Sequence, residues 1–337
     1  MRAVGFHRDL PAPALVDTDV PDPVPGERDL LVEVRAISVN PVDTKVRPSP
    51  SFVPPAGETK ILGWDAAGMV VKVGAAVRRF SVGDEVFYAG ALNRPGANSQ
   101  LHAVDERLVG HKPKSLDFAA AAALPLTSIT AWELLFERLG VAPGKSGRQR
   151  SLLVLGAAGG VGSILTQLAR RLTSLIVIAT TSRPAGREWV LAHGAHHVID
   201  HTQPLVAQLT ALGFPTVDLI VACAGSQQHF PALVEALTPQ GHLALIDDPQ
   251  SIDARLLKRK SGSLHWEFMF TRSQFATDDL AAQGHLLDEV SALVDAGVLR
   301  STMTANLGQI TAANVMKAHD QIKAGGVTGK LVLAGWP

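Results

Sequence analysis

Short apolar stretches separated by glycine and proline fill the first part of the chain. The stretch LLVEVRAISV (30–39) is strand-like, and GMVVKVG (68–74) alternates apolar and polar positions between its glycines. The stretch FSVGDEVFYAG (80–90) indicates a turn followed by a strand. This pattern predicts a mostly β domain over residues 1–124.

The pattern changes between Asp117 and Trp132. DFAAAAALP indicates a short helix that Pro125 ends, and LTSITAWELLFERLG indicates a second helix. Thr127 or Ser128 is the expected N-cap of that second helix. We place the start of the second domain at residue 125.

From residue 151 onward, apolar strands alternate with amphipathic helices. SLLVLG (151–156) predicts a buried strand, SILTQLARRL (163–172) a helix, and LIVIAT (175–180) the next strand. Such alternation indicates a parallel sheet covered by helices on both faces. The chain is therefore predicted to be an α/β protein, with a doubly wound Rossmann domain over residues 125–279.

The tail from about residue 280 adds two helices and a last strand, GKLVLAG (329–335). We expect this strand to return to the β-rich domain. Residues 1–124 and 280–337 would then form one domain of the protein.

Composition narrows the class of protein. The 337 residues fit two domains, 18% are charged, and the net charge of zero leaves no broad basic field for nucleic acid or an anionic membrane. The single cysteine, Cys223, excludes a disulfide framework and a Cys-rich zinc lobe. The N-terminus lacks the apolar core of a signal peptide. We expect a cytoplasmic protein that acts on a small molecule.

A glycine-rich turn, GAAGGVG, joins the strand 151–156 to the next helix. Gly156, Gly159 and Gly162 allow a tight turn, close approach of backbone N–H groups to a pyrophosphate, and close packing of the helix start. Gly160 and Val161 begin the helix, whose N-terminus favours an anion. We interpret the turn as a dinucleotide site, and a turn that only packs is the alternative.

The next strand ends in ATTSRPAGRE, where an NAD site usually has an acidic residue. Thr181, Ser182 and Arg183 occupy this place, and no acid occurs between Arg138 and Arg187. Hydroxyls and a guanidinium bind a 2′-phosphate through charge-assisted hydrogen bonds of about 1.5–3 kcal/mol each. NADPH is therefore the expected cofactor, unless Arg183 and Arg187 are ordinary surface residues.

Several motifs together resemble those of the medium-chain dehydrogenase/reductase superfamily, over essentially the whole chain. They are NPVDTK, LGWDAAG, AALPLTSITAWE, GAAGGVG, GHKPKSL and SLHWEFMFTR. They look like the branch named zinc-type alcohol dehydrogenase-like, which is close to the NADPH:quinone reductases. The resemblance implies an oxidoreductase with a GroES-like catalytic domain and a Rossmann domain.

Zinc-dependent members of that superfamily hold the catalytic metal with Cys, His and a second Cys or acid. Matching motifs place these ligands at Asn40, at Trp64 (followed by Asp65) and near Leu126. None of the three is a good zinc ligand, and Asp43 and Asp65 alone do not make a zinc site. The resemblance therefore implies an enzyme without a metal.

Without zinc to polarise a carbonyl, the oxidation of a simple alcohol is difficult. Hydride delivery to a conjugated acceptor remains feasible, because the acceptor itself spreads the arriving charge. We predict NADPH-dependent reduction of a quinone or an α,β-unsaturated carbonyl. A zinc-dependent alcohol dehydrogenase and an NADPH-binding sensor with little turnover are the alternatives.

The resemblance also implies roles for individual residues. Asn40, Asp43, Tyr88 and Thr130 are the candidate catalytic residues, with Asn40 and Tyr88 as hydrogen-bond donors in a substrate pocket that has Trp64 as a wall. The alternatives are a turn brace for Asp43, a surface position for Tyr88 and a helix cap for Thr130. Loops 41–60 and 247–275 are expected to shape the pocket.

Further cofactor contacts follow from the same resemblance. Besides Thr130 and the glycine turn, the expected contacts are Thr127, His201, Ala224, Gly225, Ile246 and Lys330. Lys330 is expected to reach the cofactor phosphates, and Ile246 to form a wall of the nicotinamide site. Cys223 ends a buried strand and is expected to be a core thiol rather than a nucleophile.

The stretch SLHWEFMF places Trp266, Phe268 and Phe270 at alternate positions. In the superfamily the comparable strand pairs across a two-fold axis, so the resemblance implies a homodimer. An internal core strand is the alternative.

Overall fold

The chain forms two compact units. A computed structural model describes residues 1–8, 14–46, 49, 53–146 and 149–337. The first unit is Met1–Ile129 with Phe270–Pro337, and the second unit is Thr130–Met269. The predicted α/β class, with a β-rich domain and a parallel-sheet domain, is confirmed. The boundaries, placed at 124/125 and 279/280 from the sequence, lie at 129/130 and 269/270 in the structure.

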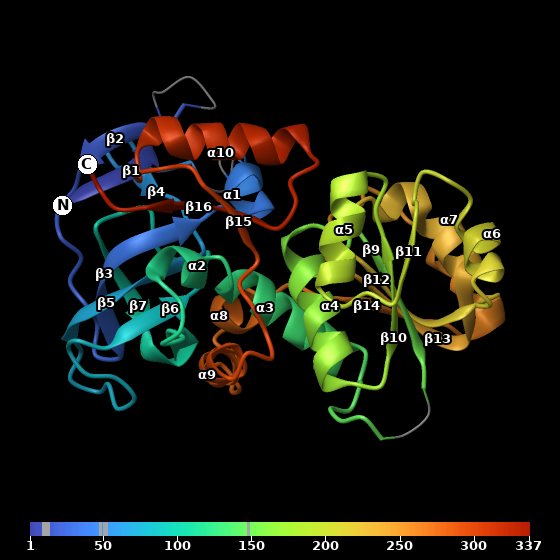
Figure 1. Cartoon of the computed structure of the whole chain (residues 1–337). Coiled ribbons are helices and arrows are strands. Elements are labelled where there is room, and N and C mark those ends of the chain that lie inside the picture. The colour runs from blue at the N-terminus through green and yellow to red at the C-terminus, as the bar shows by residue number, and fades with distance from the viewer. Residues whose placement is uncertain (9–13, 47–48, 50–52, 147–148) are drawn as a thin grey trace. The chain divides into compact units, whose positions relative to one another are not determined.

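Sheets of mostly antiparallel strands form the first unit (Figure 1). One sheet has the order β2-β1-β4, and the other has the order β15-β16-β3-β5-β6-β8, with β7 also paired to β3. The strands are β1 (Arg2–Phe6), β2 (Val16–Asp19), β3 (Asp29–Ser38), β4 (Lys60–Ile61), β5 (Ala66–Val73), β6 (Glu85–Tyr88), β7 (Leu101–Asp105), β8 (Val109–His111), β15 (Met303–Asn306) and β16 (Lys330–Ala334).

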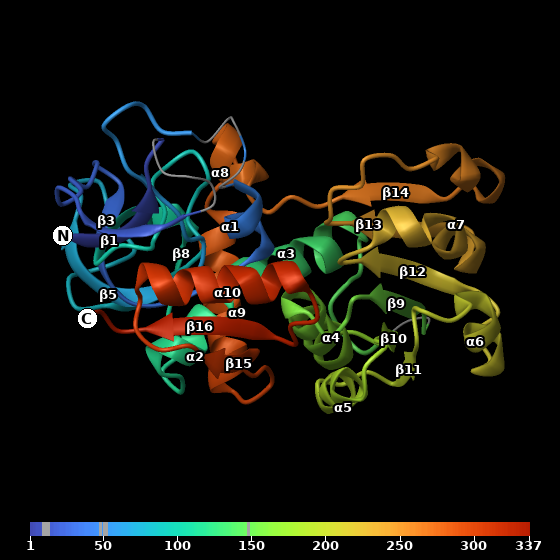
Figure 2. The same ribbon diagram turned by 90° about the horizontal axis from the view of Figure 1, so that it is seen from above.

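The last strand returns to the first unit, as the sequence predicts. β16 pairs antiparallel with β3, which joins segments about three hundred residues apart, and α10 packs along β16 in both views (Figures 1 and 2). The helices of this unit are α1 (Pro41–Val46), a 3-10 turn (Glu106–Leu108), α2 (Phe118–Ala122), α8 (Thr271–Phe275), α9 (Ala282–Asp295) and α10 (Ala312–Ala324), and α3 (Pro125–Trp132) crosses the unit boundary.

A parallel sheet with the order β11-β10-β9-β12-β13-β14 forms the second unit. In Figure 1, α4 and α5 lie on one face of the sheet and α6 and α7 on the other. The strands are β9 (Ser151–Leu155), β10 (Ile176–Thr180), β11 (His197–Ile199), β12 (Val217–Ala222), β13 (Leu237–Leu245) and β14 (Ser263–Trp266). The helices are a π-helix (Glu133–Arg138), α4 (Gly160–Leu172), α5 (Pro184–Ala192), α6 (Leu205–Ala211), α7 (Ser226–Ala236) and a 3-10 helix (Ala254–Lys260).

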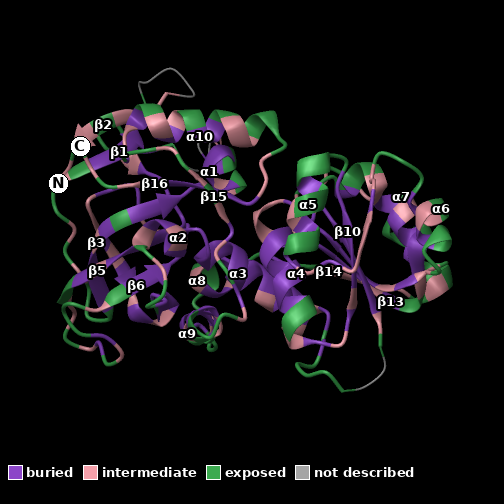
Figure 3. Ribbon diagram, in the orientation of Figure 1, coloured by how far each residue is buried: buried purple, intermediate pink, exposed green. Residues whose placement is uncertain are grey.

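The strand order places a switch point between β9 and β12. The chain runs outward through β10 and β11 on one side, then returns to build β12, β13 and β14 on the other. Every residue of β9 is buried, because helices cover both faces of the sheet (Figure 3). Ligands of open parallel sheets bind outside the carboxyl ends of the strands at such a point.

Two local predictions are wrong. The helix after Pro125 begins at Pro125 itself, so Thr127 and Ser128 lie inside the first turn, because proline is well suited to the first helical position. β14 ends at Trp266, and Phe270 is the N-cap of α8 and only 2% exposed. The alternation of aromatic residues therefore does not continue on one face to Phe270.

One segment of the described chain is long enough and apolar enough to cross a membrane, judged by its length and composition alone. It covers Phe118–Arg138, and 83% of its most apolar window is buried inside the protein. The segment is interrupted by Pro125 and is divided between α2, α3 and the π-helix.

Candidate functional site

The glycine turn after β9 has the geometry of an anion cradle. Gly156 has a φ of 75°, which permits the tight turn out of the strand. A Cβ on Gly162 would lie 2.5 Å from Ala157 Cα, so only glycine allows α4 to start this close to the strand. Gly159 is the N-cap of α4 and provides no side-chain cap, which leaves the first backbone N–H groups of the helix for an anion.

The end of β10 completes this turn with hydroxyl groups. Thr180 Oγ1 accepts a hydrogen bond from the Gly156 N–H (3.2 Å) and so orients the glycine turn. Sequence reasoning missed Thr180, although its place at the end of a strand was the available signal. Thr181 is buried, whereas Ser182 and Arg183 are exposed at the start of α5.

The ends of β12 and β13 meet at the N-terminus of α7. Gly225 caps this helix with a φ of 68°, and Asp247 Oδ2 accepts a hydrogen bond from the Ser226 N–H (2.8 Å). The other oxygen of Asp247 and the Ser226 hydroxyl are buried, and neither has a hydrogen-bond partner within the described parts of the chain. Buried polar atoms of this kind are uncommon and indicate a place for a ligand or a water molecule. Neither residue was singled out from the sequence.

His201 and Cys223 flank the same strand ends. His201 Nδ1 is buried without a partner among the described residues, and the imidazole meets His229 edge to face at 5.9 Å between ring centres. Burial, and secondarily the charge of Asp247, raises the pKa of Cys223 to about 12. The thiol is therefore un-ionised at neutral pH and is not an activated nucleophile. Ile246 and Ala224 follow β13 and β12 at this edge.

A buried centre of charged and amide groups lies in the first unit. We use the name "buried centre" for a set of four residues that are each at most 3% exposed: Asn40, Asp43, Asp65 and Lys330. Lys330 Nζ, on the first residue of β16, donates to Asp65 Oδ2 (2.9 Å), to the Val39 carbonyl (3.0 Å) and to Asn40 Oδ1. Asn40 Nδ2 donates to Asp65 Oδ2 (2.8 Å) and to the Trp64 carbonyl (3.3 Å).

The neighbours of Asp65 show its ionisation state. Asp65 Oδ1 accepts a hydrogen bond from the Leu126 N–H (2.8 Å), so its recorded partners are an amide, an ammonium and a backbone N–H, which all donate. Burial raises the pKa of Asp65, and the Lys330 ammonium opposes this rise. Because donors surround both oxygens, the carboxylate form satisfies this environment and the protonated form does not.

Asp43 is the second acid of the buried centre. Its Oδ2 accepts a hydrogen bond from the Asn40 N–H (2.6 Å), whereas its Oδ1 is buried without a partner in the described chain. Burial raises the pKa of Asp43 to about 7, against the lowering effects of the Asn40 N–H and of Lys330. Asp43 is therefore partly protonated at neutral pH, unlike an ordinary surface aspartate.

Two known protein families match separate stretches of the chain. The family described as alcohol dehydrogenase GroES-like domain matches residues 26–114, and the family described as zinc-binding dehydrogenase matches residues 193–333. A zinc-type alcohol dehydrogenase-like protein of Staphylococcus aureus is 36% identical over 315 residues, which cover 92% of each chain. The chain belongs to the medium-chain dehydrogenase/reductase superfamily. It is an oxidoreductase of that superfamily, as the sequence motifs predict.

The chain is also similar to a bacterial protein of known structure and to a plant protein. The crystal structure of a putative zinc-dependent alcohol dehydrogenase from Rhizobium etli is 50% identical, with a TM-score of 0.95, and the match covers 100% of this chain and 98% of that one. An NADPH-dependent alkenal/one oxidoreductase of Arabidopsis thaliana is 36% identical over 239 residues, which are 67% of this chain and 60% of that one.

Zinc does not fit the residues of this medium-chain dehydrogenase/reductase. Trp64 and Leu126 offer no side-chain ligand atom, and the Asn40 amide is engaged with Lys330 and Asp65. Throughout the described residues, no three His, Cys, Asp or Glu side chains are grouped so that they could hold a metal ion. We therefore derive no step of the reaction through zinc.

The buried centre changes two predicted roles. Asn40 is 1% exposed and uses its amide N–H groups on Asp65 and Trp64, so it is not the free substrate donor expected from the sequence. Lys330 uses its three N–H groups inside the protein, so it has none left for the cofactor phosphates. Both corrections have the same cause: β16 brings an ammonium next to Asp65.

Tyr88 is not on the surface, and its hydroxyl has a partner. It is 0% exposed, and its hydroxyl lies 3.1 Å from His102 Nδ1. His102 Nε2 faces the Pro95 carbonyl (2.9 Å), so Nε2 carries the imidazole proton and Tyr88 donates to Nδ1. Burial lowers the pKa of His102 to about 4 and raises that of Tyr88. The Tyr88 proton is therefore engaged with His102 and is not available to a substrate.

The remaining predicted pocket residues are also buried. The Trp64 indole donates to the Ala91 carbonyl (3.1 Å) and meets the Phe270 ring edge to face. Thr127 donates from Oγ1 to the Leu124 carbonyl (3.1 Å), which leaves its hydroxyl without a free proton for a cofactor. Thr130 is 5% exposed and is the first residue of the second unit.

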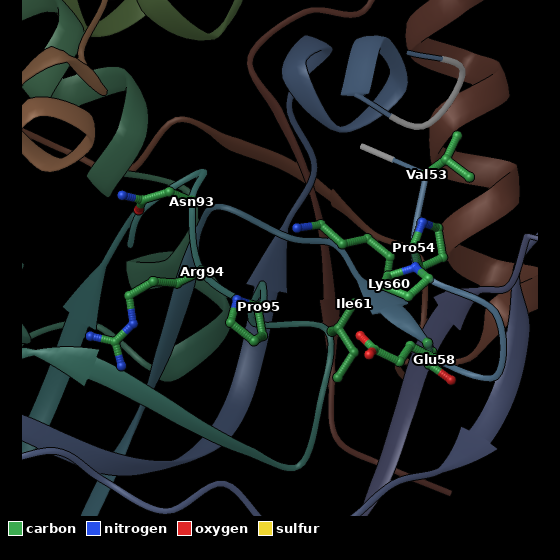
Figure 4. Close-up of a pocket in the computed structure, with 10 residues that line it drawn as sticks. Val53, Pro54, Glu58, Lys60, Ile61, Asn93, Arg94 and Pro95 are labelled. Carbon is green, nitrogen blue, oxygen red and sulfur yellow. The ribbon is translucent and has the colours of Figure 1, made fainter. Parts of the chain in front are cut away.

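A small open pocket in the first unit is lined by prolines, by polar side chains and by the aliphatic residues Val53 and Ile61 (Figure 4). Its volume is ≈ 260 Å³, below the range of about 300–1,000 Å³ that is common for ligand sites. Its Arg94 is held by Asp29 in a two-pronged ion pair (2.7 and 2.8 Å) and is not available to a ligand. Of the predicted loop 41–60, residues 47–48 and 50–52 lie outside the described residues.

Proposed function

We propose that this protein transfers a hydride from NADPH to a quinone or an α,β-unsaturated carbonyl without the help of a metal. The observation that carries the proposal is the identity of the residues at the three positions matched to zinc ligands. Asn40, Trp64 and Leu126 replace the thiolates and imidazole that zinc requires. Without a Lewis acid, an acceptor that spreads the arriving negative charge over a conjugated system is easier to reduce than a simple carbonyl.

The carboxyl edge of the sheet in the second unit supports a phosphorylated nicotinamide cofactor. The glycine turn offers backbone N–H groups to the pyrophosphate, and Ser182 and Arg183 offer a hydroxyl and a cation to a 2′-phosphate. The buried, unpartnered oxygens of Asp247 and Ser226, noted above for the described chain, are acceptors for ribose or amide N–H and O–H groups. NADPH supplies a hydride when it is bound there.

Relatives support the substrate class. The Arabidopsis relative is named an NADPH-dependent alkenal/one oxidoreductase, and a tomato relative that is 40% identical over 194 residues is named 2-methylene-furan-3-one reductase. The matches span 60% and 48% of those two proteins. Both names describe conjugated carbonyl compounds, in which hydride addition places charge on an oxygen through the conjugated system.

Reduction of such an acceptor also needs a proton. Asp43 is the candidate source, because its pKa of about 7 leaves it partly protonated at neutral pH and its Oδ1 lacks a partner in the described residues. Since Asp43 is only 1% exposed, its proton would have to pass through a water molecule or a neighbouring group to reach a substrate. It replaces Tyr88 in this role, since the Tyr88 proton is engaged with His102.

The proposal is tested by NADPH oxidation, followed at 340 nm, with a panel of enones, enals, quinones and simple aldehydes. We expect turnover with the conjugated acceptors, no turnover with simple aldehydes, and no change after treatment with a chelator. Tight NADPH binding without turnover on any acceptor would contradict the proposal and favour a sensor. Activity with simple alcohols or aldehydes that disappears with the chelator would favour a zinc-dependent alcohol dehydrogenase, which the name of the Rhizobium etli protein suggests.

We also propose that the protein is a homodimer. β14 is the edge strand of its sheet, as Figure 2 shows, and carries or adjoins two exposed aromatic residues, Trp266 (52%) and Phe268 (47%). An unprotected edge strand with exposed aromatic residues favours pairing with a second strand. Light scattering after size exclusion should give a dimer for the wild type and a monomer for Trp266→Arg, and a monomeric wild type would contradict this proposal.

A further inference from the structure

The three positions matched to zinc ligands converge on one carboxylate. Asn40 and Leu126 both donate hydrogen bonds to Asp65, and Trp64 precedes Asp65 in the chain and also accepts from Asn40. The segments that meet here follow β3, precede β5, open α3 and begin β16. All of them belong to the first unit. The three positions that the resemblance matches to zinc ligands thus lie around Asp65 in the structure.

We propose that the ammonium of Lys330 is the built-in cation of this centre and that it closes the site to divalent metal ions. It neutralises Asp65 and fixes the Asn40 amide, so that Oδ1 faces the ammonium and Nδ2 faces the carboxylate. The inference rests on the metal-free chemistry of the proposed function and explains how the protein fills the place of the ion.

The number of hydrogen-bond donors and acceptors in the buried centre supports an ammonium rather than a metal ion. An ammonium has three N–H donors and no acceptor, and Lys330 meets an acceptor with each donor: the Val39 carbonyl, Asn40 Oδ1 and Asp65 Oδ2. Asp65, in turn, receives donors on both oxygens. A buried ion pair is favourable only when the remaining donors and acceptors are satisfied in this manner.

Electrostatics explain the exclusion of a second cation. The side chains of Lys330 and Asp65 are 4% and 0% exposed, so water screens their charges poorly. A divalent ion bound to Asp65 Oδ2 would lie within a few ångströms of the ammonium, where like charges repel strongly in a poorly solvated site. It would also displace the hydrogen bonds of the carboxylate. Removal of the ammonium should therefore open a weak site composed of Asp65, Asp43 and the Asn40 carbonyl oxygen.

Metal titration of the full-length chain tests this inference. After treatment with a chelator, wild-type protein and Lys330→Ala are titrated with Zn²⁺ by calorimetry and with Co²⁺ by visible absorption. We expect no stoichiometric site in the wild type, and a site in Lys330→Ala that binds at least about tenfold more tightly than any residual wild-type binding. Lys330→Arg, which keeps a cation, and Lys330→Ala combined with Asp65→Asn should both lack this site. Stoichiometric zinc in the wild type that Asp65→Asn abolishes, or no metal binding by folded Lys330→Ala, would overturn the inference.

A double-mutant cycle provides a second measurement that does not depend on Lys330→Ala being folded. Lys330→Met and Asp65→Asn each leave one buried charge unpaired and should each lower Tm by about 10 °C. The double variant removes both charges and should lose clearly less than the sum of the two single changes. Strict additivity of the two losses would overturn the ion pair as the centre of the site.

The result is separable from the proposed function. A wild type that binds no zinc but reduces no conjugated acceptor would leave the built-in cation intact and refute the proposed reaction. A wild type that reduces enones and also holds zinc at Asp65 would refute the built-in cation and leave the proposed substrate class intact.

Discussion

Two regions of the protein differ in whether their buried polar atoms have hydrogen-bond partners. One is the carboxyl edge of the sheet in the second unit, and the other is the buried centre of the first unit. At the edge, Asp247, Ser226 and His201 each have a buried polar atom without a partner among the described residues. In the centre, Lys330, Asn40 and Asp65 satisfy one another almost completely. The edge has the properties of a site that a ligand completes, whereas the centre has already been completed by the protein.

The difference shows two ways in which a protein can satisfy buried polar groups. An unsatisfied buried polar group costs about 1–3 kcal/mol, which is tolerable where a cofactor later supplies the partner. A buried carboxylate that no ligand reaches has no such later partner, so its charge must be neutralised by groups of the protein itself. Asp43 is the exception in the centre, because its Oδ1 has no partner in the part of the chain that the structure describes. A substitution of Asp43 is therefore the first test of this difference between the two regions.

The largest effect is expected for Asp43→Asn, and it depends on pH. The folded-state pKa of about 7 lies above the ordinary value of 3.8, so the folded protein holds the proton more tightly than the unfolded chain. The stability of the wild type should therefore be full below about pH 4 and fall as the pH rises towards 7. The loss from this group is on the order of 4 kcal/mol. Asp43→Asn lacks this loss, so it should become more stable than the wild type at pH 8.

Urea unfolding at pH 4.5, 6 and 8 measures this difference. A difference between variant and wild type that does not change with pH would show that Asp43 titrates normally. If Asp43 is also the proton source, Asp43→Asn should lower kcat with conjugated acceptors while leaving NADPH affinity unchanged.

The next effect separates packing from cofactor approach within the glycine turn. A Cβ at Gly162 would lie 2.5 Å from backbone, whereas a Cβ at Gly159 would meet only the Gly156 carbonyl oxygen, at 3.5 Å. Gly162→Ala should lose about 1–3 kcal/mol of stability and, through the displaced helix start, roughly thirtyfold in NADPH affinity. Gly159→Ala should keep its stability and lose only affinity. Thermal unfolding and fluorescence titration with NADPH measure both quantities, and equal stability losses would contradict the geometry.

The glycine turn and the buried centre also differ in how well the sequence alone predicts them. The glycine turn and the alternation of strands and helices are local patterns, so they correctly predict the Rossmann unit and the position of its edge. The buried centre depends on β16 pairing with β3, which brings Lys330 to Asn40 across 290 residues. No local pattern contains that information, and the role given to Lys330 was therefore wrong. Tyr88 was misjudged for the same reason, since its burial and its partner His102 are set by the sheet.

The choice of cofactor is expected to depend on Arg183. Its side chain is exposed at the start of α5, while Arg187 one turn later donates to the Val198 carbonyl (3.1 Å) and serves as a matched control. Loss of a charge-assisted bond to a 2′-phosphate costs about 1.5–3 kcal/mol, so Arg183→Ala should lower the ratio of NADPH to NADH affinity roughly 10- to 150-fold. Arg187→Ala should leave the ratio unchanged. An unchanged ratio in Arg183→Ala would refute the preference for NADPH.

The smallest effect is expected for Cys223, which lies at the same edge but has no assigned chemistry. Burial raises the pKa of its thiol to about 12, so less than a thousandth is thiolate at pH 8. Cys223→Ser should therefore change kcat less than about twofold, and iodoacetamide should inactivate the native protein slowly at pH 8. Mass spectrometry of the alkylated peptide, beside an activity assay, measures this. Rapid alkylation of native protein with loss of turnover would show an ionised thiol, and the edge would then contain a nucleophile in addition to its unpartnered hydrogen-bonding atoms.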